Sequence, residues 1–166
     1  MLLGIEGVID VRSVEKGRFY LRSDYNDEPV LFQCICVGQG DDGSDTLMAI
    51  RFAPGSELPM AIESLPHGGP VVALPEVHIR VDAPSLVATN LNSGIRSGMF
   101  LIAGEEAFVA VPQNFRSWSL INVTKGEHVD GEWGKNWIAF SRWLFVIKDS
   151  GEEITISSFG NLHEPD

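Results

Sequence analysis

Apolar and polar residues alternate along much of this chain, and this period of two most restricts what it can fold into. In the stretch EVHIRVD (76–82), valine and isoleucine occupy one parity and charged or histidine side chains the other. The stretch EEITISSF (152–159) follows a DSG turn and alternates in the same way. Successive side chains of a strand point to opposite faces, so the pattern predicts half-buried β-strands.

Turn residues divide the apolar runs into predicted strands and hairpins. Hairpins are expected in four segments, 5–23, 28–54, 97–113 and 143–159, and further strands in 70–81 and 116–124. Pro75 breaks segment 70–81, because proline cannot donate to a ladder. The chain is therefore predicted to be one all-β domain over residues 1–166. We expect a mainly antiparallel sandwich or partly closed barrel of about ten short strands.

One short helix is predicted near residues 57–65. Ser56 can cap its N-terminus, and Leu58, Ile62 and Leu65 recur at the i, i+4, i+7 spacing of one helical face. The sequence PHGG that follows is typical of a helix end.

Residues 133–148 leave two interpretations open. Apolar residues from Trp133 to Ile147 are spaced by four and three, which is a helical period. However, the run WLFVI has no polar face, and a compact turn follows it directly. We expect a long buried strand from about Trp137 to Lys148 and keep the helix as the alternative.

The composition favours a globular protein with an acidic surface. Of 166 residues, 44% are hydrophobic and 21% charged, and 23 acids against 12 bases give a net charge of −11. The bases occur singly, which disfavours binding to nucleic acid or to anionic lipid. An acidic field attracts basic protein partners, although acidic composition also serves solubility alone.

The N-terminal segment does not resemble a secretory signal, because it lacks a basic region and acids interrupt its apolar run. No stretch approaches the ~18 apolar residues of a membrane-spanning helix. We therefore expect a cytoplasmic protein without a membrane span. Unpaired edge strands would allow homo-oligomers.

Cys34 and Cys36 lie on one predicted strand, too close together for an ordinary structural disulfide. They could share a zinc ion only with further ligands, and no second cysteine pair exists in the sequence. We expect two buried thiols and no cofactor or metal. Asp41, Asp42 and Asp45 are typical of a hairpin turn, with weak calcium binding as the alternative.

His78 lies among charged residues on one parity of segment 76–82. A neighbouring carboxylate could orient it as a general base, but the same pattern describes the solvated face of a surface strand, which we favour. The chain contains neither a G-x-S-x-G nor an H-E-x-x-H motif. No catalytic residue is therefore assigned.

The loop GEHVDGEWGKNW is the strongest candidate for a binding site. Acids beside aromatic side chains can form a sugar platform or a protein hot spot, although the tryptophans could instead be core anchors. The candidate ligand- or partner-binding residues are Glu127, His128, Asp130, Glu132, Trp133 and Trp137.

Three functions follow from these observations. The first is a non-catalytic acidic module, inhibitor-like or an assembly subunit, that docks a basic protein. The second is a β-domain that binds a small molecule or carbohydrate through the 127–137 loop. The third is a metal-assisted enzyme centred on His78 or His128.

Overall fold

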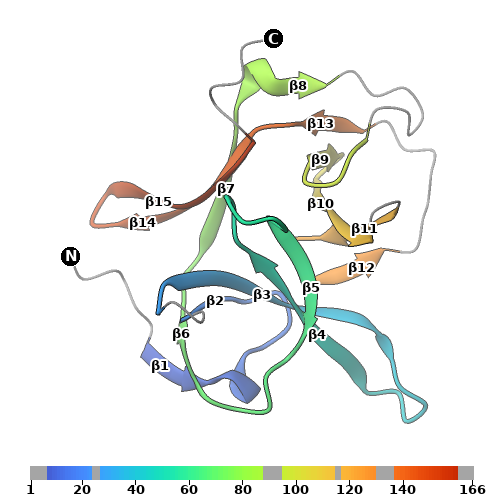
Figure 1. Ribbon diagram of the computed structural model, residues 1–166, viewed down its shortest axis with the longest axis vertical. Coiled ribbons are helices and arrows are strands. Elements are labelled where there is room, and N and C mark those ends of the chain that lie inside the picture. Colours follow the sequence, from blue (N-terminus) through green and yellow to red (C-terminus); the bar gives the residue numbers. More distant parts are fainter. Residues whose placement is uncertain (1–6, 24–26, 88–94, 115–116, 130–136, 161–166) are drawn as a thin grey trace.

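Fifteen strands and two short 3-10 helices make up the regular structure of the described residues (Figure 1). The computed structural model describes residues 7–23, 27–87, 95–114, 117–129 and 137–160, without the side chains of 113, 114 and 117. The strands are β1 (Gly7–Asp10), β2 (Phe19–Ser23), β3 (Pro29–Gln39), β4 (Asp45–Phe52), β5 (Met60–Ser64), β6 (Pro70–Ala73), β7 (Val77–Val81), β8 (Leu86–Val87), β9 (Phe100–Ala103), β10 (Glu106–Asn114), β11 (Ser117–Asn122), β12 (Glu127–Val129), β13 (Ile138–Phe140), β14 (Trp143–Asp149) and β15 (Glu152–Phe159). The 3-10 helices are η1 (Val11–Ser13) and η2 (Ala83–Ser85).

The strands form two sheets. The larger follows the order β1-β6-β2-β3-β12-β11-β10-β9-β13-β8, and β4 and β5 extend it from the other side of β3. The smaller has the order β15-β14-β7. All strand pairs are antiparallel except β12 with β3. The predicted all-β, mainly antiparallel class is confirmed, and the architecture is sandwich-like.

Three of the four predicted hairpins are confirmed: β3–β4, β9–β10 and β14–β15. The N-terminal hairpin is wrong, because β6 pairs with β1 on one side and with β2 on the other. The break at Pro75 is confirmed, since β6 ends at Ala73 and β7 begins at Val77.

The helix predicted near residues 57–65 is wrong. Residues 54–59 form turns, and β5 then pairs with β4 over its whole length. The Ser56 hydroxyl donates to the carbonyls of Ala53 and Leu58 instead of capping a helix. Pairing with β4 buries Met60 and half-buries Ile62, which a short isolated helix could not do.

Residues 137–148 are mostly β-structure, so the helical interpretation is wrong there, but the single long strand that we expected is also wrong. The segment contains β13 and β14, separated at residues 141–142. β13 belongs to the larger sheet and β14 is the central strand of the smaller sheet, so this segment links the two.

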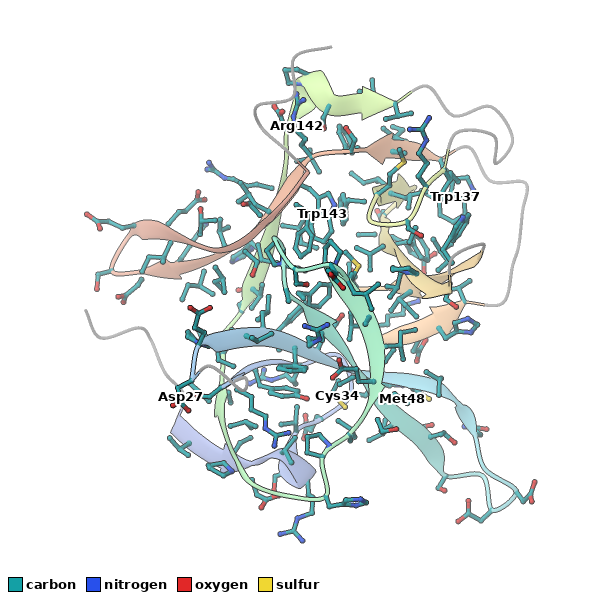
Figure 2. All side chains as sticks on the ribbon, in the orientation of Figure 1. Asp27, Cys34, Met48, Trp137, Arg142 and Trp143 are labelled. Carbon is teal, nitrogen blue, oxygen red and sulfur yellow. The ribbon has the colours of Figure 1, made fainter. Side chains whose placement is uncertain are left out.

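β3 is buried on both faces and divides the core. Leu31 and Ile35 belong to the main core, whereas Cys34 lies in a separate cluster with Tyr20 and Val71. The main core is defined by its buried members Leu31, Ile35, Ile50, Phe52, Met60, Leu74, Phe100, Val109, Val111, Ile121, Val123, Phe140, Trp143, Phe145 and Phe159. Figure 2 shows Trp143 near the centre of the molecule, between the two sheets.

Candidate functional site

The strand path β5-β4-β3-β12-β11-β10 curls round until its two ends face each other. β5 packs beside β10, but the two strands share no ladder, so the path does not close into a barrel. In Figure 1 this opening lies between β5 and the group of β10, β11 and β12. A groove of about 1040 Å³ occupies it. Its lining residues are Val37, Met48, Glu57, Leu58, Pro59, Met60, Ala61, Ile62, Ser97, Pro112, Ser119 and His128.

The apolar wall of the groove is a continuation of the main core. Val37, Met48 and Ile62 share the strand parity of core residues on β3, β4 and β5, and they pack against that core. Each remains partly exposed, because no strand of the described residues covers this end. Met60 is buried beneath them, and Leu58 at the rim is 54% exposed. Apolar surface of this kind marks a ligand or partner site more often than a solvated face.

Few polar groups interrupt this wall. His128 on β12 opposes Ile121 on β11, a main-core residue, so its side chain faces the groove as Ile121 faces the core. Ser119, Ser97 and Glu57 are the other polar lining residues, and the described lining includes no lysine or arginine. The described lining is therefore mainly apolar, with His128 as its basic side chain and Glu57 as its acid.

The basic side chains of the described chain are largely neutralised by acids. Lys16 Nζ lies 2.7 Å from Glu127 Oε1 and 4.0 Å from Asp45 Oδ2. The hydrogen bond that Lys16 donates to the Glu127 carboxylate raises the pKa of Lys16. Similar ion pairs join Arg12 to Asp10, Arg51 to Glu63, Arg80 to Glu153, Lys125 to Glu106 and Arg142 to Asp82.

Three other acids form no ion pair with a lysine or arginine among the described residues. Asp42 accepts hydrogen bonds only from Ser44, at the tip of the β3–β4 hairpin. These bonds lower the pKa of Asp42 and account for the turn. Asp41 beside it and Glu57 at the groove are exposed and form no ion pair within the described ranges. We call Asp41, Asp42 and Glu57 the unpaired acids. Asp41 and Asp42 precede β4 and Glu57 follows it, so they lie at opposite ends of that strand, and only Glu57 lines the groove.

The structure places only part of the predicted 127–137 site. Glu127 and His128 lie on β12, where His128 lines the groove and Glu127 bonds Lys16. Asp130, Glu132 and Trp133 lie outside the described residues. Trp137 is 7% exposed and packs edge-on against Phe108, with ring centroids 5.0 Å apart. It is a core anchor, as the alternative interpretation expected.

His78 lies on the smaller sheet, away from His128. Its Nε2 is 3.8 Å from Glu76 Oε2, and the Glu76 side chain is 83% exposed. Nearby Arg80 pairs with Glu153 on β15. His78 and His128 line different hollows of the surface. This arrangement matches the solvated strand face that the alternation favoured.

The two cysteines are free and buried, as predicted. Burial raises the pKa of Cys34 to about 11, which keeps it as the neutral thiol at ordinary pH. In the described ranges, no three His, Cys, Asp or Glu side chains are grouped to hold a metal ion.

Comparison with protein-family models, with curated proteins and with solved structures finds no match for this chain. No helix in the described ranges is long and apolar enough to cross a membrane.

Sequence reasoning missed most of the groove. In the sequence, Met48 looks like an ordinary core residue of a strand, and Ile62 looks like one of a helix. Neighbouring residues do not indicate that the described strands leave both side chains partly uncovered. Leu58, an apolar residue in a run of turn residues, was the one available signal.

Proposed function

We propose that the protein is a non-catalytic binding module that docks a basic protein partner at the end of the molecule where the groove opens. The observation that carries this proposal is an apolar groove lined by Glu57 and by no lysine or arginine among the described residues, on a protein with further unpaired acids at Asp41 and Asp42.

Two physical arguments support this function. Acids already paired with lysine or arginine contribute little to the outside field, whereas Asp41, Asp42 and Glu57 form no ion pair among the described residues. Complementary charge speeds the encounter with a basic partner and fixes its orientation. The adjoining apolar surface then supplies the short-range burial that charge alone does not.

The test measures whether this group of acids, and not the overall charge, binds a cationic chain. A fluorescein-labelled peptide of alternating Ser and Lys is titrated with the protein, and fluorescence anisotropy is recorded. We expect binding that weakens as NaCl rises from about 20 to about 200 mM, because salt screens exposed charges. The matching Ser–Glu peptide should not bind.

Two triple variants separate the unpaired acids from the general field. Asp41→Asn, Asp42→Asn, Glu57→Gln should weaken binding by about tenfold, as loss of several exposed charge contacts predicts. Glu105→Gln, Asp149→Asn, Glu152→Gln removes the same number of acids elsewhere and should leave binding nearly unchanged. Equal losses in both variants, or no binding to the wild-type protein, would contradict the proposal.

A further inference from the structure

A second hollow lies between the smaller sheet and the β9–β10 hairpin. Its volume of about 590 Å³ is within the usual range for small-ligand sites. One wall is β7, an edge strand of the smaller sheet, and another comes from β9 and the turn that joins it to β10. Residues 17–19, 74–76 and 123–124 also border it.

Apolar side chains of the main core reach this hollow. Phe100 and Val123 are buried members of that core. Phe19, Ile79 and Ile102 pack against the core and remain partly exposed. The hollow therefore offers apolar surface that a ligand of matching size can cover.

Acids outnumber lysines and arginines in the lining. Three glutamates, Glu76, Glu105 and Glu106, line the hollow with one arginine, Arg18. Glu106 is neutralised, because its Oε1 lies 3.0 Å from Lys125 Nζ. Glu76 and Glu105 are exposed and form no ion pair with a lysine or arginine among the described residues. Since Glu76 leads into β7 and Glu105 lies in the β9–β10 turn, each wall carries one such carboxylate.

The other ionisable groups of the lining leave this charge largely in place. His78 Nε2 is 3.8 Å from Glu76 Oε2, which is longer than a hydrogen bond. Arg18 is shared with a separate hollow beside Ile9 and Val14. The hollow thus combines apolar surface with two exposed carboxylates, and this combination favours a cation over an anion.

We infer that this hollow binds a small molecule with an apolar body and one positively charged amine. The apolar body would displace water from Ile79 and Ile102, and the ammonium group would lie near Glu76 and Glu105. A neutral molecule of the same shape would keep only the apolar contacts, and a carboxylate would be repelled. The site is separate from the groove, so the inference does not depend on the proposed function.

Three ligands that differ only in their head group test this inference. Phenylbutylamine, phenylbutanol and phenylpentanoate each carry a phenyl ring on the same tetramethylene chain. Each is titrated into isotope-labelled protein at about 20 mM NaCl, where screening is weak, and the amide chemical shifts are followed by NMR. We expect the amine to bind at least about fivefold more tightly than the alcohol and the carboxylate to bind most weakly. The shifts should centre on β7 and the β9–β10 turn.

Matched variants separate the charge contacts from the apolar ones. Glu76→Gln and Glu105→Gln should each weaken amine binding several-fold and leave alcohol binding unchanged, because the amide keeps the shape and loses the charge. Glu152→Gln removes an exposed acid beside the β14–β15 turn and should change neither. Ile102→Ala should weaken binding of both ligands, because it removes an apolar contact that they share.

The possible failures point to different errors. Equal binding of the amine and the alcohol would overturn the selection for a cation. Amine binding that survives both glutamate variants would place the cation elsewhere and overturn the site. If none of the three ligands binds, the hollow is not a small-ligand site. None of these results bears on the groove, which the cationic peptide tests.

Discussion

The main core ends differently at its two sides. On one side the smaller sheet closes it with aromatic rings: Trp143 stacks on Phe159 at 4.4 Å and meets Phe145 edge-on at 5.1 Å. The Trp143 indole N–H also donates to the Gly98 carbonyl at 2.8 Å. On the other side the core ends in the partly exposed wall of the groove, which includes Met48 and Ile62.

This difference shows what closure requires. The β14–β15 hairpin and β7 supply three strands whose inner faces complete the aromatic end. At the groove, β5 and β10 come together without a ladder, so apolar surface stays accessible. We therefore expect stability to be concentrated at the closed end, whereas apolar surface stays accessible at the open end.

The largest effect expected from this comparison is on Trp143, which is 2% exposed. Trp143→Ala should lower the free energy of unfolding by about 3–5 kcal/mol, the usual cost of truncating a buried tryptophan. Met48→Ala, at the half-exposed end of the same core, should cost less than about 2 kcal/mol. Urea denaturation of the two variants measures both values. Equal losses would show that the groove end is packed as tightly as the aromatic end.

A second pair of variants tests how tightly the smaller sheet is attached. Gly160 follows β15 with φ of +81°, and an added Cβ would collide with the Ser141 carbonyl and the Arg142 side chain. Gly151, in the turn of the same hairpin, has φ of +85° and open space around it. Gly160→Ala should destabilise the protein by at least about 2 kcal/mol, whereas Gly151→Ala costs only the backbone strain, about 1 kcal/mol. Thermal unfolding compares them, and equal shifts would mean that the collision is relieved without cost.

Local pattern was sufficient to predict most strands but not all of their partners. Short turns specify their own hairpins, so β3–β4, β9–β10 and β14–β15 were predictable from residues close in sequence. The pairing of β1 with β6 joins segments about sixty residues apart, and no local signal encodes it. The β5 segment was misread because Leu58, Ile62 and Leu65 fit a helical spacing while the contact with β4 decided the structure.

The candidate site was less predictable than the fold, because it depends on which strands fail to meet. His128 was identified from its acidic and aromatic neighbours, yet its position in the groove follows from its register with Ile121. Trp137 looked the same in sequence as an exposed aromatic, and only its contact with Phe108 makes it a core residue. Alternation tells which parity is apolar but not whether another strand covers it.

The effect expected to be smallest at neutral pH concerns the separate cluster of Cys34, Tyr20 and Val71 on the other face of β3. It tests whether water is excluded from that face as it is from the closed end. Burial raises the pKa of Cys34 from 9.0 to about 11 and that of Tyr20 from 10.0 to about 12. The unfolded chain therefore loses these protons first. Stability should be unaffected below pH 9 and should fall as the pH rises to about 12.

Two variants, Tyr20→Phe and Cys34→Ala, check this pH dependence, and Tyr20→Phe gives the clearer result. The Tyr20 hydroxyl is buried and has no hydrogen-bond partner among the described residues, so its removal should be neutral or stabilising at pH 7. Between pH 10 and 12 the variant should lose less stability than the wild-type protein, and Cys34→Ala should show the same behaviour from pH 9. Urea unfolding at a series of pH values gives the slopes. Slopes identical to wild type would mean that water reaches both groups, and that β3 shields only the face it turns to the main core.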